Sequence, residues 1–99
     1  MKNYIIAPSA SKDLSNIADY FLTVNVSAGE KLFHEFNKKC RNLVSFPQMG
    51  KSYNHIKSNL RGLTLNGYII FYRIVDDNIE ILRVVNDRQD LESIFSEDD

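Results

Sequence analysis

The chain has 99 residues, of which 43% are hydrophobic and 25% are charged, and its formal net charge is −1. This length fits one compact domain spanning residues 1–99, and no apolar run approaches the roughly 18 residues that a membrane-spanning helix needs. The single cysteine, Cys40, cannot form an internal disulfide, which fits a reducing cytoplasm. A net charge near zero does not indicate nucleic-acid binding, so direct, sequence-specific contact with nucleic acid is not expected.

The first quarter of the chain predicts a short strand followed by an amphipathic helix. Residues 3–7 favour a strand that ends at Pro8, because proline has no N–H to give to a sheet ladder. The next segment, residues 10–24, has apolar side chains at intervals of three or four, and its polar side chains lie opposite them. Ser9 or Ser11 is expected to cap this helix by accepting a hydrogen bond from a first-turn amide.

A second amphipathic helix is predicted immediately after the first. Ser27 and Glu30 have the spacing of a capping box, and Pro47 ends the helix near Phe46 because the residue before a proline avoids helical geometry. Its apolar side chains form one stripe: Leu32, Phe33, Phe36, Cys40, Leu43 and Val44. Two helices joined by so short a link are expected to pack as an antiparallel hairpin.

Three strands are predicted in the second half of the chain, over residues 60–65, 68–75 and 79–85. Asn66-Gly67 is typical of a two-residue hairpin turn, in which both central residues need a positive φ. Asp76-Asp77-Asn78 separates the second strand from the third, since Asp and Asn side chains can hydrogen-bond their own backbone in a turn. A single helical turn over residues 90–95 is expected to follow and to place Leu91, Ile94 and Phe95 on an apolar surface.

The predicted element order is therefore β-α-α-β-β-β with a short terminal turn. This is an α+β fold in which a helical hairpin packs on one face of a small, mainly antiparallel sheet. The residues expected to be mostly buried are Leu14, Ile17, Phe21, Leu32, Phe36, Cys40, Tyr68, Ile70 and Tyr72.

The middle strand has apolar side chains on both of its faces. Ile69, Phe71 and Val75 point away from the face that the helices cover, and Arg73 lies among them. A terminal segment could cover this second face, or another protein could complete it. We favour the second arrangement, which predicts an exposed apolar patch of Ile69, Phe71 and Val75.

The sequence contains few groups suited to catalysis. His34 and His55 have no Cys, Asp or second His at ligand spacing, so no metal and no cofactor are expected. Arginines gather on and around the predicted strands instead, at positions 61, 73, 83 and 88. Arg binds carboxylates and phosphates but is a poor general base, because it stays protonated at neutral pH. The arginines therefore favour a binding surface over a catalytic one.

In its order of elements and landmarks, the sequence resembles the RelE/ParE superfamily of toxins from bacterial type II toxin–antitoxin systems. The resemblance covers nearly the whole chain. Its landmarks are Ala10, Asp13-Leu14, Ile17 and Tyr20, the segment 43–46 with Pro47 and Gly50, Leu60-Arg61, Gly67-Tyr68, Tyr72-Arg73, the strand 79–85, and Arg88 with Asp90.

Two positions indicate which branch of the superfamily the chain is similar to. In RelE-like enzymes, which cut mRNA in the ribosome, an Arg typically follows the Gly-Tyr pair and a C-terminal aromatic residue carries a hydroxyl. Here these positions hold Ile69 and Phe95. The resemblance therefore implies a ParE-like toxin that inhibits DNA gyrase by binding, without catalysis. A RelE-like endonuclease and a non-toxic relative that only binds an antitoxin are the alternatives.

The resemblance also implies a partner. Toxins of this superfamily are neutralised by a cognate antitoxin, here ParD-like or similar, that lays an amphipathic segment across the toxin. Such systems act in the cytoplasm and in plasmid stabilisation. The residues expected to bind the target or the antitoxin are Arg61, Ile69, Phe71, Arg73, Val75, Arg83 and Arg88.

Overall fold

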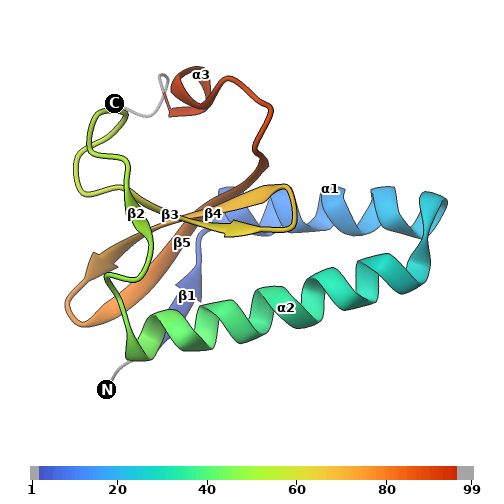
Figure 1. The fold of residues 1–99 in the computed structure, drawn as a ribbon, viewed down its shortest axis with the longest axis horizontal. Coiled ribbons are helices and arrows are strands. Elements are labelled where there is room, and N and C mark those ends of the chain that lie inside the picture. Colours follow the sequence, from blue (N-terminus) through green and yellow to red (C-terminus); the bar gives the residue numbers. More distant parts are fainter. Residues whose placement is uncertain (1–2, 96–99) are drawn as a thin grey trace.

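The structure is a computed structural model that describes residues 3–95, and it has an α+β architecture in which two helices pack against a five-stranded sheet (Figure 1). This confirms the predicted fold class. In chain order the elements are β1 (Tyr4–Ile6), α1 (Pro8–Val24), α2 (Val26–Ser45), β2 (Lys51–Ser52), β3 (Arg61–Leu65), β4 (Tyr68–Val75), β5 (Asn78–Asn86) and α3 (Leu91–Phe95).

The sheet has the strand order β1-β5-β4-β3-β2. Its centre is the predicted antiparallel meander of β3, β4 and β5. Both connecting turns have the positive φ values expected of tight hairpins, 45° at Asn66 and 86° at Gly67, then 49° at Asp76 and 68° at Asp77. The first strand, β1, pairs in parallel with β5 and forms one edge of the sheet.

An irregularity in β5 shifts the register of the central pair of strands. Phe71 lies opposite Arg83, but the next residue, Tyr72, lies opposite Ile81, so Leu82 is an extra residue on β5. A bulge of this kind bends the strand and increases its twist. It also lets the side chains of Ile81 and Val84 point to the same face, although they are three positions apart.

The ends of the two long helices differ from the sequence-based expectation. The helix α1 begins at Pro8 itself, with Ala7 as its N-cap and no side-chain cap, because proline is well suited to the first helical turn. Neither Ser9 nor Ser11 caps it. The cap of α2 is Asn25, whose side chain accepts a hydrogen bond from the Ala28 N–H, so the predicted capping box is wrong.

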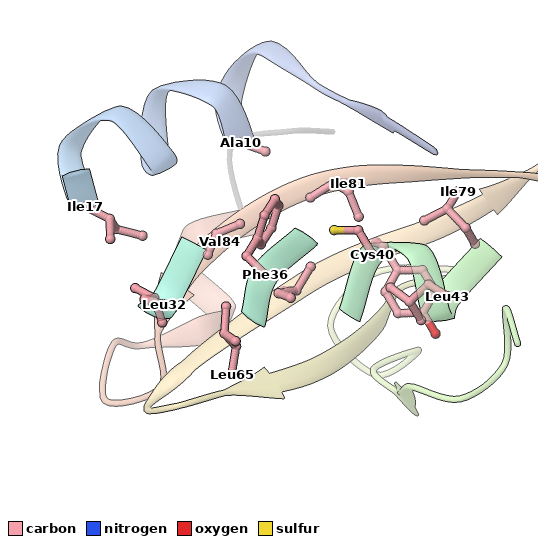
Figure 2. Packing of buried hydrophobic residues seen from close by; sticks show 12 residues of the cluster. Ala10, Ile17, Leu32, Phe36, Cys40, Leu43, Leu65, Ile79, Ile81 and Val84 are labelled. Carbon is pink, nitrogen blue, oxygen red and sulfur yellow. The ribbon is translucent and has the colours of Figure 1, made fainter. Parts of the chain in front are cut away.

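The helical hairpin and the sheet enclose the main hydrophobic core, which we call the helix-face core (Figure 2). Its buried members are Ala10, Ile17, Leu32, Phe36, Cys40, Leu43, Leu65, Ile70, Tyr72, Ile79, Ile81 and Val84, and Leu14, Phe21 and Tyr68 pack against them. This confirms the predicted burial of the helix stripes and of one face of β4.

A second, smaller core covers the other face of the sheet, and we call it the loop-face core. Its buried residues are Leu60, Ile69, Phe71, Val85 and Phe95. The segment between β2 and β3 and the short helix α3 form its lid (Figure 1). The Phe71 ring makes edge-to-face contacts with Tyr53 at 5.0 Å and with Phe95 at 5.1 Å between ring centroids. The terminal segment, together with a loop, therefore covers this face.

Candidate protein-interaction surfaces

The expected apolar patch of Ile69, Phe71 and Val75 is not exposed as predicted. Ile69 is 5% exposed and Phe71 is fully buried, because both belong to the loop-face core. Only Val75, near the β4–β5 turn, presents a substantial part of its side chain to solvent. The prediction was wrong because it left the second face to a partner, whereas α3 and the preceding loop cover it.

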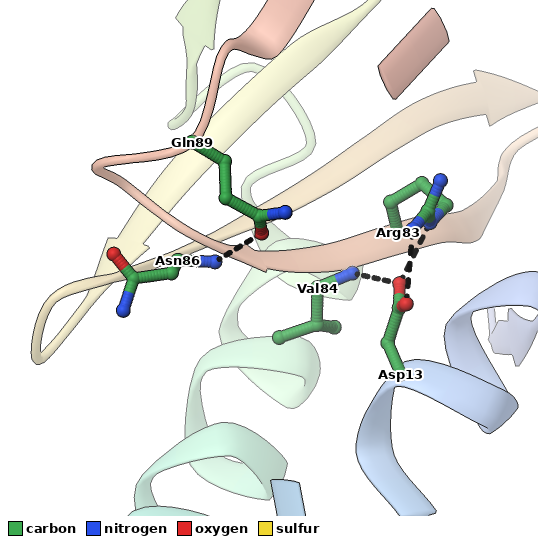
Figure 3. Close-up of polar contacts among 5 residues, drawn as sticks. All are labelled: Asp13, Arg83, Val84, Asn86 and Gln89. Carbon is green, nitrogen blue, oxygen red and sulfur yellow. Dashed lines mark hydrogen bonds and ion pairs between the residues drawn. The ribbon is translucent and has the colours of Figure 1, made fainter. Parts of the chain in front are cut away.

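Arg83 joins the sheet to α1 rather than facing a partner (Figure 3). Its Nε and Nη2 donate to the two carboxylate oxygens of Asp13 at 2.8 and 3.0 Å. The same carboxylate accepts the backbone N–H of Val84 at 2.9 Å. Asp13 thus neutralises the half-buried Arg83 and accepts a hydrogen bond from the Val84 N–H. This amide lies on the part of β5 that does not pair with β1. Sequence reasoning placed Asp13 on the polar side of the helix and missed this contact.

Arg61 and Tyr72 hold the turn between α2 and β2. The Tyr72 hydroxyl donates to the Pro47 carbonyl at 2.7 Å and accepts the Gly50 N–H at 2.9 Å. An Arg61 guanidinium nitrogen donates to the carbonyls of Gln48 and Gly50. A Cβ at Gly50 would lie 2.6 Å from the Tyr72 hydroxyl, so the turn needs glycine there. Burial raises the pKa of Tyr72, although the Gly50 hydrogen bond and Arg61 oppose the shift.

The two remaining arginines of the predicted set are exposed. Arg73 pairs across the strands with Glu80 at 2.6 Å, and Arg88 lies in the turn that follows β5. Among residues 3–95, the Arg88 side chain has no ion-pair partner. Two of the four predicted arginines therefore have structural roles, and two remain accessible to another molecule.

Groups with catalytic or metal-binding potential are few in the described part of the chain. Residues 3–95 contain no group of three or more His, Cys, Asp or Glu side chains that could hold a metal ion. Burial raises the pKa of Cys40 to about 12, so its thiol stays protonated near neutral pH. None of the helices in this range is long and apolar enough to cross a membrane.

The outer side of the helical hairpin carries an apolar groove, which we call the hairpin groove. It is lined by Ala18, Phe21, Leu22, Val26, Gly29, Glu30 and Phe33. A Cβ at Gly29 would lie 2.7 Å from the Phe21 Cβ, so glycine lets the helices approach closely there. Leu22 and Val26 are 68% and 52% exposed. Sequence reasoning missed the groove because Leu22 lies near the end of the first predicted helix and Val26 lies between the two predicted helices.

A second exposed apolar area lies where α2 ends beside the β4–β5 turn, and we call it the turn patch. It is lined by Ser45, Phe46, Pro47, Gln48, Met49, Ile74 and Asp77. Phe46 is 66% exposed, Met49 45% and Ile74 38%. The alternation of side chains along β4 puts Ile74 on the same face as Tyr72, but Ile74 lies near the end of the strand and is exposed.

Comparison with known proteins identifies a protein family that matches most of the chain. The family described as "ParE toxin of type II toxin-antitoxin system, parDE" matches residues 4–91. The protein "Toxin ParE1" of Mycobacterium tuberculosis, in two strains, is 24% identical over 91 residues, which cover 90% of this chain and 93% of the relative.

Two solved structures share the fold. The chromosomal ParDE toxin–antitoxin system from P. aeruginosa contains a chain with a TM-score of 0.72 and 20% identity, covering 87% of this chain and 95% of that one. The isolated E. coli RelE toxin matches with a TM-score of 0.59 and 15% identity over 96% of this chain and 95% of its own. Because the family match spans most of the sequence, the chain belongs to the ParE toxin family of type II toxin–antitoxin systems.

Proposed function

We propose that this chain is a toxin that acts by binding DNA gyrase, rather than by cutting mRNA, and that a cognate antitoxin neutralises it. The observation that carries the choice is the burial of Ile69 and Phe95. These are the positions at which a RelE-like nuclease would place a cation and an aromatic hydroxyl. Here both side chains are apolar and lie in the loop-face core, each 5% exposed.

The polar groups on the sheet also suit binding better than proton transfer. General acid–base catalysis needs a group that can exchange a proton with the substrate near the working pH. The Tyr72 hydroxyl is engaged with Pro47 and Gly50, and burial raises its pKa. The exposed cations Arg73 and Arg88 can pair with carboxylates of a protein partner, and Val75 supplies apolar surface beside Arg73.

The hairpin groove is the surface that best suits the antitoxin. Its lining is almost entirely apolar, with Glu30 as the one charged side chain among its residues. An amphipathic helix could place side chains spaced three and four apart between α1 and α2. Lys38 and Arg41 are exposed or partly exposed on α2, about two turns beyond Phe33, and could meet acidic residues at the rim of such a helix.

The choice of target can be tested with the purified chain. We expect it to inhibit the ATP-dependent supercoiling of plasmid DNA by purified bacterial gyrase, and the antitoxin to reverse this inhibition. The same preparation is then added to a ribosome-based translation reaction, and the mRNA is mapped for cleavage. Codon-specific cleavage with unchanged supercoiling would establish the endonuclease alternative and overturn the proposal.

The antitoxin site can be tested with two matched substitutions on α1. Leu22→Ser removes an exposed side chain that lines the groove, whereas Val24→Ser removes one that is 58% exposed and lies outside it. We expect Leu22→Ser to weaken antitoxin binding by about tenfold or more and Val24→Ser by less than about twofold. Calorimetric titration measures both, and circular dichroism checks the fold. Equal effects from the two variants would place the antitoxin elsewhere.

A further inference from the structure

The turn patch is a second exposed apolar surface, well separated from the hairpin groove. The two lie at opposite ends of α2, whose 20 residues extend over roughly 30 Å (Figure 1). Phe46 and Met49 come from the turn after α2, Ile74 comes from β4, and all three line one hollow. Exposed side chains of this size gathered in one place mark an interaction surface more often than single exposed residues do.

The backbone that presents this patch is held in one conformation. The Tyr72 hydroxyl bridges Pro47 and Gly50, and the Arg61 guanidinium binds the Gln48 and Gly50 carbonyls. Met49 therefore projects from a turn that is hydrogen-bonded to the buried Tyr72 and the partly buried Arg61. Binding to a fixed surface costs less conformational entropy than binding to a loop that must first become ordered.

One of the residues that line the turn patch is charged, and its charge is negative. This residue is Asp77, and neither Asp77 nor the adjacent Asp76 forms an ion pair with another residue in the range 3–95. The C-terminal end of α2, where the helix dipole is negative, adjoins the same hollow and has no basic residue in its last turn. Arg61 is not among the residues that line the patch, but it lies beside it, because it donates to the Gln48 carbonyl and lines an adjoining hollow with Gln48 and Ile74. The exposed Phe46 ring adds an aromatic face that can also attract a cation.

We propose that Phe46, Met49, Ile74 and Asp77 form a docking site for a basic, apolar segment of a protein other than the antitoxin. Apolar side chains of that segment contact Met49 and Ile74, and an arginine or lysine meets Asp77 and the Phe46 ring. This site goes beyond the proposed function, because it is separate from the hairpin groove. The chain thus has two protein-binding ends, and both can be occupied at once.

The test uses two short peptides as probes of the chemistry. The acetylated and amidated tetrapeptides Leu-Arg-Leu-Arg and Leu-Glu-Leu-Glu are titrated separately into the ¹⁵N-labelled chain, and amide signals are followed by NMR. We expect the basic peptide to shift the signals of Phe46, Met49 and Ile74, and the acidic peptide to leave them in place. Raising the salt concentration should weaken the effect, since the charges lie at the surface.

Substitutions then assign the binding to the patch. Phe46→Ser should weaken binding of the basic peptide by about tenfold, and Asp77→Asn by about threefold, because a surface charge contributes less than an apolar anchor. Asn tolerates the positive φ of 68° at position 77, so the turn is kept. Asp19→Asn, an exposed carboxylate on α1, is the matched control and should change nothing.

The same titration is repeated on the complex of the chain with its antitoxin. Unchanged binding of the basic peptide is expected, because the groove and the patch are separate surfaces. Loss of binding in the complex would assign the patch to the antitoxin interface and overturn the proposal. Equal shifts by both peptides, or shifts that concentrate at Leu22 and Val26, would overturn it as well. None of these outcomes depends on whether gyrase is the target.

Discussion

The two faces of the sheet are covered by different kinds of structure. On the helix face, α1 and α2 contribute 17 and 20 residues and enclose twelve buried side chains. On the loop face, the five-residue helix α3 and the segment between β2 and β3 enclose five buried side chains. Both faces of β4 are nevertheless sealed, since Tyr72 on one side and Phe71 on the other are fully buried.

The difference lies in how each cover is held. The two long helices keep their own backbone hydrogen bonds, and α1 is further fixed to β5 by the Asp13–Arg83 ion pair. In contrast, α3 is too short to be stable alone, so the apolar contacts of Phe95, Leu91 and Ile94 must hold it in place. We therefore expect the helix face to open only with global unfolding, and the loop face to open locally at a lower free energy.

The largest expected effect is from Phe36→Ala on the helix face. Phe36 is 3% exposed at the middle of α2, and truncation leaves a cavity between two helices and a sheet that cannot close around it. The free energy of unfolding should fall by about 3–5 kcal/mol, as measured by urea denaturation. Phe46→Ala, just beyond the same helix, is the control and should change stability by less than about 0.5 kcal/mol. Similar losses from both would contradict the assigned core.

Asp13→Asn tests the contact that fixes α1 to β5. The variant keeps the size of the side chain but removes the negative charge of Asp13 that pairs with the half-buried Arg83. We expect a loss of about 2 kcal/mol, because hydrogen bonds to charged groups contribute more than neutral ones. Glu80→Gln breaks the exposed pair with Arg73 and should cost less than about 0.5 kcal/mol. If the two variants cost the same, the ion pair on α1 has no special role.

The helix-face core could be predicted from the sequence because its signals are periodic and local. Apolar residues three and four apart identified both helices, and the Asn-Gly and Asp-Asp pairs located the hairpin turns. The helix caps were less predictable, since both Asn25 and Ser27 are suitable N-cap residues for α2, and the choice depends on where α1 ends in three dimensions. The β5 bulge at Leu82 has no marker in the sequence.

The candidate site was harder to predict, because exposure depends on what the rest of the chain covers. The sequence shows that Ile69 and Phe71 are apolar and lie on one face of a strand. The segment around Tyr53 has no periodic pattern, so the sequence does not predict that this segment covers them. Whether an arginine binds inside the fold or faces solvent is similarly hard to predict from the sequence. Arg61 and Arg83 have partners inside the fold, while Arg73 and Arg88 are exposed, and only the packing of distant residues such as Gly50 and Asp13 separates the two pairs.

Apart from the control variants, the smallest expected effect is from Phe95→Ala on the loop face. Phe95 is as buried as a core residue, and its ring packs edge-to-face on Phe71. Truncation of a buried Phe in a rigid core costs about 3–5 kcal/mol, but α3 can detach, so the loss cannot exceed the free energy that docks this helix. We therefore expect a loss of about 1–2 kcal/mol in global stability.

Hydrogen exchange distinguishes local detachment of α3 from general destabilisation by Phe95→Ala. Local detachment should speed amide exchange in α3 and around Tyr53, because these segments cover each other's contacts with Phe71. The amides of α2 around Phe36 should keep nearly their wild-type protection apart from the small global loss, since that core lies on the opposite side of the sheet. Uniformly faster amide exchange on both faces would mean that the two cores unfold as one unit, and it would contradict the expected local opening of the loop face.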